Sequence, residues 1–310
     1  MYVSTSSSLS PMQPSSPFRR LRRWLGGSFS PYIFIAPFFI LFFAFGLYPL
    51  LYALGLSFTY WHGDEAPRFI GLSNYAYLVT SNLFWQSLAN SAILWVLTVP
   101  VQIIVAVITA ALLSRSTLRL RGFFRTALLS SYVVPLVAIA QVWLVLFDQD
   151  FGAINTLLHI LHLPSIGWLT TSEWAKPTLA LLVLWRGSGF SMLVMLAAIQ
   201  SIPTEFYEAA AIDGASVFRQ FLHITLPLLR RTIAFLVVIS TLGVVQMFLE
   251  PKVLTNGGPY NSTMTAGFFL TTYINNADYG TGAANTFLLI ILLVILSLVM
   301  LRFLRAGTES

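Results

Sequence analysis

The sequence contains no cysteine and few charged residues. Only 9% of its 310 residues are Asp, Glu, Lys or Arg, whereas 57% are apolar. The absence of cysteine excludes disulfides, thiolate metal sites and cysteine nucleophiles. Soluble domains carry roughly 25% charged residues, so this chain cannot cover a water-facing surface and is not a soluble globule. Disordered chains are poor in aromatic residues, which here make up 15% of the sequence.

Acidic and histidine side chains are missing from the middle of every long apolar run. All 11 acids and all 4 histidines fall between the runs or at their ends. Intramembrane carboxylates and histidines are the usual proton and cation relays of secondary transporters. Their absence disfavours an ion-coupled carrier, although backbone carbonyls alone can hold sodium.

The chain also lacks a nucleotide-binding loop. A P-loop requires Gly-Lys followed by Ser or Thr, but Lys176 and Lys252 precede a proline and a valine. Energy for active transport must therefore come from another polypeptide. His159 and His162 are spaced as a metal pair, yet no third ligand lies near them in the sequence, and no catalytic constellation indicates an enzyme. We expect no catalytic residue, metal site or cofactor in this chain.

Six apolar stretches are each long enough to cross the ~30 Å hydrocarbon core of a membrane, which takes ~20 residues. The predicted fold class is therefore an all-α integral membrane protein with six transmembrane helices. The predicted spans are Tyr32–Thr59, Ser87–Leu113, Phe123–Phe147, Pro177–Gln200, Thr232–Leu249 and Gly282–Leu304.

The first 30 residues are rich in Ser, Pro and Arg. The apolar run behind them is about twice the ~7–15 residues of a signal-peptide core, so we predict an uncleaved first span. The predicted organisation is a disordered cytoplasmic tail over 1–30, a membrane domain over 31–305 and a cytoplasmic tail over 306–310.

The basic residues gather on alternate loops. All but four of the 17 lie before the first span, between spans two and three, between spans four and five, or after span six. Lys and Arg are retained in the cytoplasm, so both termini are predicted to be cytoplasmic. The net charge of +6 thus reflects topology and not a nucleic-acid-binding surface. The predicted external loops are 60–86, 148–176 and 250–281. Within the second of them, Ile154–Leu163 is predicted to form an amphipathic helix on the membrane surface.

The cytoplasmic loop between spans four and five predicts two short helices joined by a glycine. Pro203 ends span four, and Thr204 is placed to cap a helix whose first turn carries acids. Gly214 is where this helix would stop. Ser216 would cap a second helix, which Pro227 would end. Three alanines in a row in the first helix would let another protein approach its backbone closely. From the residues alone, an ordinary interhelical loop that happens to contain alanines fits equally well.

This loop resembles the EAA loop of ABC-importer permeases. The matching segments are Glu208–Ala210, Asp213–Ala215 and Ile224–Pro227, within a loop over 203–227. Further segments are similar to the carbohydrate-uptake group, which includes the maltose and glycerol-3-phosphate importers: Ala198–Pro203, Val253–Pro259, Tyr48-Pro49 and Gly71–Tyr75. A departure occurs at Phe248–Lys252, where family members more often have Phe-Asp and an apolar pair. Glu250 and Lys252 are therefore expected to shape the outer mouth differently.

The resemblance implies a type I ABC importer permease fold in the bacterial cytoplasmic (inner) membrane. It implies a second, unlike permease subunit, two ATP-binding subunits that hold ATP and Mg, and an extracytoplasmic solute-binding protein. The loop would be the coupling helix that fits into the ATPase. The residues expected to carry this contact are Glu208, Ala209, Ala210, Asp213 and Gly214.

Spans four and five carry the candidate solute path. Arg186 lies near the middle of span four, where a cation is costly unless it faces water or a partner. The hypothesis is a polar cavity lined by Arg186 through Met192, with aromatic rings to stack on a sugar and Gln246 to bond its hydroxyls. The alternative is that Gly187 and Gly189 allow close helix packing and that Arg186 snorkels or pairs with the partner subunit. The candidate residues are Trp185, Arg186, Gly189, Phe190, Ser240, Gln246 and Met247.

Three other functions remain open from the sequence. The same machinery would serve for a sugar phosphate, a polyol or an amino sugar, and Arg186 favours an anionic group. A stand-alone channel or secondary carrier would transport solute without other subunits. A membrane-bound enzyme finds no support in the residues present.

Overall fold

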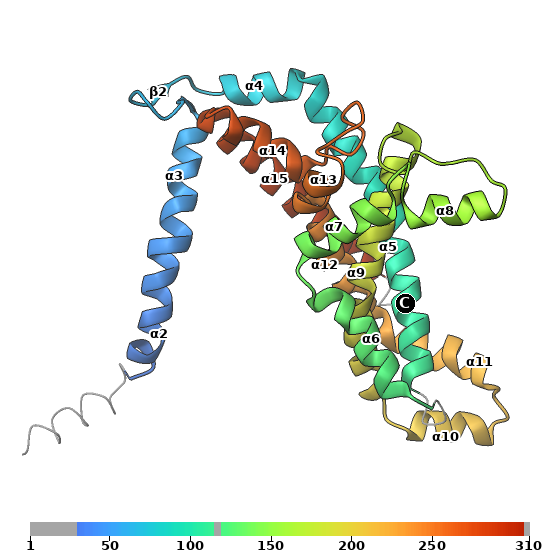
Figure 1. The fold of residues 1–310 in the computed structure, drawn as a ribbon. Helices are drawn as coiled ribbons and strands as arrows, with labels where there is room; N and C mark the ends of the chain where they lie inside the picture. The colour runs from blue at the N-terminus through green and yellow to red at the C-terminus, as the bar shows by residue number, and fades with distance from the viewer. Residues whose placement is uncertain (1–29, 115–118, 307–310) are drawn as a thin grey trace, which may run out of the picture. The chain divides into compact units, whose positions relative to one another are not determined.

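The computed structural model describes residues 30–114 and 119–306, so the predicted N-terminal tail and the end of the C-terminal tail lie outside the described residues. The chain divides into two compact units, Met1–Gly55 and Leu56–Ser310 (Figure 1). Most of the described chain is helical. The two-residue strands β1 (Thr59–Tyr60) and β2 (Arg68–Phe69) pair antiparallel.

The described part of the first unit is one apolar helical rod. It consists of α2 (Ser30–Leu41), the π-helical turn η1 (Phe42–Leu47) and α3 (Tyr48–Ser57), whose end enters the second unit. The stretch Phe34–Ser57 is long and apolar enough to span a membrane. The π turn lies directly before Pro49, and the Tyr48 amide bonds the Phe43 carbonyl five residues back. This wider turn accommodates a proline that has no amide to donate.

The second unit contains four long helices and several short ones (Figure 1). α5 and α9 pack along each other, and α6 and α12 pack against them. The helices of this unit are α4 (Ser73–Thr80), α5 (Asn82–Ser114), α6 (Arg121–Val133), α7 (Leu136–Leu146), α8 (Ala153–Ile160), α9 (Ser172–Gln200), α10 (Glu205–Ile212), α11 (Val217–Gln220), η2 (Phe221–Thr225), α12 (Leu226–Val245), α13 (Leu249–Leu254), α14 (Ala266–Asn275) and α15 (Tyr279–Ala306).

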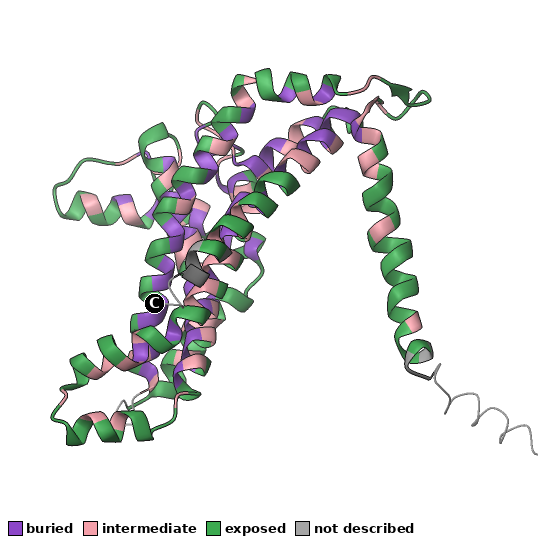
Figure 2. Ribbon diagram, turned by 180° about the vertical axis from the view of Figure 1, so that it is seen from behind, coloured by how far each residue is buried: buried purple, intermediate pink, exposed green. Residues whose placement is uncertain are grey.

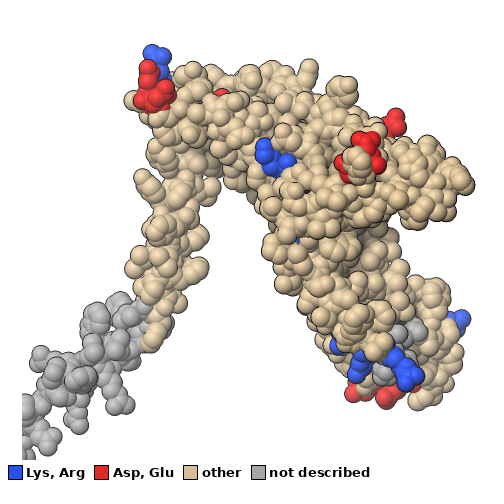
Figure 3. Space-filling view, in the orientation of Figure 1, with Lys and Arg blue, Asp and Glu red and all other residues tan. Residues whose placement is uncertain are grey.

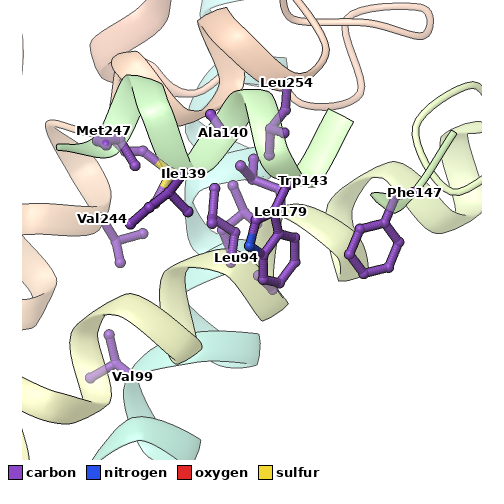
Figure 4. Close-up of a cluster of buried hydrophobic side chains, with 13 residues drawn as sticks. Leu94, Val99, Ile139, Ala140, Trp143, Phe147, Leu179, Val244, Met247 and Leu254 are labelled. Carbon is purple, nitrogen blue, oxygen red and sulfur yellow. The ribbon is translucent and has the colours of Figure 1, made fainter. Parts of the chain in front are cut away.

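Buried residues lie where these helices face one another (Figure 2). One cluster joins α5, α7, α9 and α12 through Leu94, Trp143, Leu179 and Val244, and Figure 4 shows Trp143 beside Leu94 and Leu179. A second cluster around Met192 joins α5, α9 and α12 further along their lengths. The outward-facing residues are largely apolar as well, as expected for helices surrounded by lipid.

The predicted spans are confirmed with two corrections. The described chain has five helices that could cross a membrane, or six if α6 and α7 count as one broken span. The third predicted span, Phe123–Phe147, is wrong as a straight helix, because α6 and α7 meet at 96°. Pro135 has no amide to donate and forces Val134 into an extended conformation with ψ 137°. The break brings the end of α6 beside α9.

The fifth predicted span, Thr232–Leu249, is wrong at both ends. The helix runs from Val217 to Val245, because Pro227 does not interrupt it. The π turn η2 lies directly before Leu226-Pro227, and the Leu226 amide donates to the Phe221 carbonyl. This is the same arrangement as in the first unit, and it absorbs the missing proline amide without ending the helix.

Charged side chains lie at the two ends of the second unit (Figure 3). The end that carries α10 presents arginines and acids together, and the surface between the two ends shows few charges in this view. Arg125 donates from Nη2 to the Leu113 carbonyl at 3.0 Å and so joins the facing ends of α5 and α6. The arginines near α10 and at the facing ends of α5 and α6 agree with the predicted topology, in which these helix ends are cytoplasmic.

The loop around α8 is held by one buried amide. The Asn155 Nδ2 donates to the carbonyls of Gln149 and Ile166, both at 2.9 Å, and its Oδ1 accepts from the Ile166 amide and the Trp168 indole at 3.1 and 3.0 Å. α8 covers most of the predicted helix Ile154–Leu163. Asn155 therefore fixes the return of the chain toward α9.

Replacing Asn155 with alanine should loosen this loop. The change leaves several buried polar groups without hydrogen-bond partners, and each such group costs about 1–3 kcal/mol of stability. We expect faster hydrogen exchange at the Ile166 amide, measured by mass spectrometry, and a lower Tm. Thr156→Ala is the matched control, because its hydroxyl makes a single bond, to the Gly152 carbonyl. Equal exchange rates in the two variants would contradict the role of Asn155.

Candidate coupling loop and solute pocket

The loop over 203–227, called the elbow here, contains the two predicted helices, α10 and α11. α10 begins after Thr204, whose hydroxyl makes no capping bond, contrary to the prediction. The chain reverses at Gly214 with φ +76°, a left-handed conformation that favours glycine. The Ala215 amide closes the turn by donating to the Ala210 carbonyl at 2.8 Å. Ser216 caps α11, as predicted, by accepting from the Arg219 amide.

The elbow is bonded to itself and is continuous with α12. The Tyr207 and Thr225 hydroxyls lie 2.9 Å apart, and the Gln220 Nε2 donates to the Ala215 carbonyl at 3.2 Å. The first contact ties α10 to η2, and the second ties α11 to the turn that follows α10. Because α11, η2 and α12 form one helix, the elbow is directly continuous with the fifth span.

The outer surface of the elbow is exposed. α10 has no buried residue, and Ile212 and Phe218 are 88% and 69% exposed. Among the residues expected to carry the coupling contact, Glu208, Ala209, Asp213 and Gly214 are exposed and Ala210 is half-buried. Exposed apolar side chains beside acids are typical of a protein-binding surface.

A small pocket lies between five helices of the second unit. It has a volume of about 180 Å³. α5 supplies Gln102, α6 supplies Tyr132, and α13 supplies Glu250. The other lining residues come from α9, α12 and the turn after α12: Leu182, Val183, Arg186, Gly187, Phe190, Ile239, Ser240, Gly243, Val244 and Met247.

Polar and aromatic groups converge on this pocket. The Gln102 Nε2 donates to the Ser191 hydroxyl at 2.7 Å and lies 3.3 Å from the Gly187 carbonyl and 3.4 Å from the Ser240 hydroxyl. The Tyr132 ring stacks on Phe190 with their centroids 5.1 Å apart. Hydroxyl, amide and aromatic groups are the ones that orient a polar ligand in a mostly apolar pocket.

The predicted solute-path residues divide into two groups. Arg186, Phe190, Ser240 and Met247 line this pocket together. The remaining three residues lie elsewhere.

Trp185 packs its ring against Trp143 at 6.2 Å. Gln246 lines a different pocket, of about 580 Å³, beside α14 and α15. A Cβ on Gly189 would lie 2.1 Å from the Leu128 carbonyl oxygen, so Gly189 allows α6 and α9 to touch. α9 is also continuous through both glycines, which favours the close-packing alternative for Gly189.

Comparison with known proteins identifies the family. Residues 102–306 match the family described as "binding-protein-dependent transport system inner membrane component". The chain belongs to this permease family. The lactose permease protein LacF of Rhizobium radiobacter is 36% identical over 86% of this permease and 91% of LacF. The trehalose/maltose permease protein MalF of Thermococcus litoralis is 32% identical over 79% of this permease and 85% of MalF.

The fold of the permease also matches solved structures. A chain of a bacterial ABC transporter involved in import of the acidic polysaccharide alginate aligns with a TM-score of 0.79 at 23% identity, covering 93% of this permease and 99% of that chain. The predicted resemblance to carbohydrate-uptake ABC permeases and the predicted all-α membrane fold are thus confirmed. The inner-membrane location is confirmed by the family, and the relatives are permease subunits and not enzymes.

Three polar residues of the permease pocket were not predicted from the sequence to lie in the solute path. Gln102 is a polar residue inside the second span, and a polar side chain at such a position could have been predicted from the sequence to line a polar pocket. Tyr132 lines the pocket from the end of α6, just before the break at Pro135, and the sequence did not predict this break. Glu250 was expected at the outer mouth with Lys252, but it lies against Arg186, while the Lys252 Nζ donates to the Asn256 Oδ1 at 2.8 Å.

Proposed function

We propose that this permease is one membrane-spanning subunit of an ATP-driven importer for a sugar or a related polyhydroxy solute. The family match, which includes both the elbow and the pocket, carries the proposal. Relatives named for lactose, trehalose/maltose and arabinooligosaccharides support a carbohydrate solute. They belong to multicomponent transport systems, which favours a subunit over a stand-alone carrier.

The proposed complex contains a second permease subunit, two ATP-binding subunits and an extracytoplasmic solute-binding protein. A related structure was determined with a substrate-bound periplasmic protein, which supports the last of these partners. ATP and Mg would be bound by the ATP-binding subunits. This chain would supply the solute path and the surface through which ATP-driven movement reaches it.

The elbow is the proposed contact with the ATPase. Its exposed outer face, with Glu208, Ala209, Asp213 and Gly214, would dock, and its internal bonds would let it move as one body. The continuous helix from α11 to α12 leads to Ile239, Ser240 and Gly243, which line the pocket. Movement of the elbow would therefore reshape the pocket.

The pocket is the proposed site where solute passes. Its volume of about 180 Å³ is below the ~300–1,000 Å³ of typical ligand pockets, so a disaccharide requires the surrounding helices to separate. The stacked rings of Tyr132 and Phe190 offer an apolar face to a pyranose, and Gln102 and Ser240 offer hydrogen bonds.

Reconstitution tests the proposed complex. An affinity tag on this chain should recover a second permease, an ATPase and a solute-binding protein, and the complex in proteoliposomes should accumulate labelled saccharide only with ATP and the loaded binding protein. Transport by this polypeptide alone would instead establish a stand-alone carrier.

Substituting Arg186 with alanine tests the pocket. The change leaves Glu250 without its partner, a loss that costs about 3–5 kcal/mol for a buried pair and less here, because both side chains are partly exposed. We expect solute uptake and coupled ATP hydrolysis to fall about tenfold or more, measured per folded complex after a Tm comparison. If both activities stay intact, Arg186 has no role in the solute path.

A further inference from the structure

The pocket holds two charged side chains of opposite sign. Of its lining residues in the described chain, only Arg186 and Glu250 are charged. The Arg186 Nη1 lies 3.8 Å from the Glu250 Oε1, and their side chains are 30% and 16% exposed. The two residues come from α9 and α13, which are separated by the elbow and α12 in the sequence. The fold therefore pairs them across the pocket.

Arg186 has donor capacity that the described residues leave unused. Its guanidinium carbon lies 5.5 Å from the centre of the Tyr132 ring. Its Nε is buried and has no hydrogen-bond partner among the described residues. A guanidinium with free N–H groups binds a carboxylate, sulfonate or phosphate well. Glu250 is the one lining group that opposes an incoming anion.

Lys252 does not neutralise the carboxylate of Glu250. Its ammonium group is bonded to Asn256 and lies 5.6 Å from the centre of the Phe268 ring. It also lines the separate pocket that contains Gln246. The charge of Glu250 is thus directed at Arg186 and not at its neighbour in the sequence.

We infer that Glu250 is a specificity-determining residue that neutralises Arg186, so that the pocket accepts uncharged saccharides and disfavours anionic ones. This inference rests on the proposed function, and it reverses the sequence-based expectation that Arg186 favours an anionic solute. The carboxylate of Glu250 occupies the position that the acid group of a uronate or a sugar phosphate would need. An uncharged sugar has no acid group that would compete with Glu250 for this position.

The test measures binding to the membrane complex without its solute-binding protein, because that protein imposes its own selectivity. The probes are glucose, glucuronate and protonated glucosamine, which share one ring and differ in charge. Affinities are measured by calorimetry on the detergent-solubilised complex. The wild-type complex should prefer glucose to both charged sugars.

Two substitutions should shift this preference in opposite directions. Glu250→Gln should raise the affinity for glucuronate relative to glucose by about tenfold or more, because Arg186 is then unopposed. Arg186→Gln should raise the relative affinity for protonated glucosamine, because Glu250 is then unopposed. Each variant tests the inference if the other does not fold. Glu173→Gln is the matched control, since Glu173 is an exposed acid on α9 outside the pocket.

The possible results separate the two claims. Ratios within about twofold of wild type in both variants would overturn the inference while leaving ATP-dependent saccharide uptake, and hence the proposed function, intact. A wild-type complex that binds none of the three sugars would overturn the proposed pocket and the inference with it. A glucuronate shift in Glu173→Gln as large as in Glu250→Gln would also overturn it, because the effect would then come from general charge.

Discussion

Replacing Ala209 with tryptophan is expected to abolish solute-stimulated ATP hydrolysis and uptake while leaving the permease folded. Ala209 lies on the exposed side of α10, a helix with no buried residue. Because Ala209 is exposed in the described structure, a bulky side chain there can point into solvent, and the Tm of the purified permease should change little. If the elbow docks closely against an ATPase, the same side chain prevents contact along the helix. We expect at least a hundredfold loss of coupled activity, equivalent to about 3 kcal/mol.

The control for this variant is Ala76→Trp. Ala76 is also an exposed alanine on an eight-residue helix, α4, at the opposite end of the second unit (Figure 1). It should keep the ATPase subunits bound during co-purification, whereas Ala209→Trp should lose them. Normal ATPase coupling and co-purification in Ala209→Trp would refute the docking role of the elbow.

Replacing Gly189 with alanine is expected to destabilise the permease by about 3 kcal/mol or more. The new Cβ would lie 2.1 Å from the Leu128 carbonyl oxygen and 2.8 Å from the Leu128 carbonyl carbon. Both are backbone atoms of α6, so no flexible side chain can move aside. α6 must move away from α9, and Tyr132, near the end of α6, then moves away from Arg186 and Phe190. A lower Tm and a lower yield of folded protein would be the measured effects.

Gly122→Ala provides the comparison. Gly122 also lies in α6, and a Cβ there would meet no atom of the described residues within 4 Å. Alanine is favoured over glycine in a helix by about 1 kcal/mol, so this variant should be as stable as the wild type or slightly more. An unchanged Tm for Gly189→Ala would show that α6 and α9 do not pack as closely as the structure indicates.

The sequence alone determined the membrane class, the number of apolar stretches and the elbow. These features depend on local composition and spacing: a run of about 20 apolar residues can span a membrane, and Gly214 and Ser216 direct the turn between α10 and α11 through their own backbone and side-chain chemistry. The family resemblance was carried by the same contiguous segments, so it needed no knowledge of packing.

Only the tertiary structure decided the pocket. Gln102, Tyr132, Arg186 and Glu250 come from four helices far apart in the chain, and nothing in their spacing predicts that α13 folds back against α9. The 96° break after α6 and the π turn before Pro227 also became visible only in the three-dimensional structure. Local sequence fixes which backbone bonds a proline removes, but it does not tell whether the helix breaks, as before Pro135, or continues through a π turn, as before Pro227.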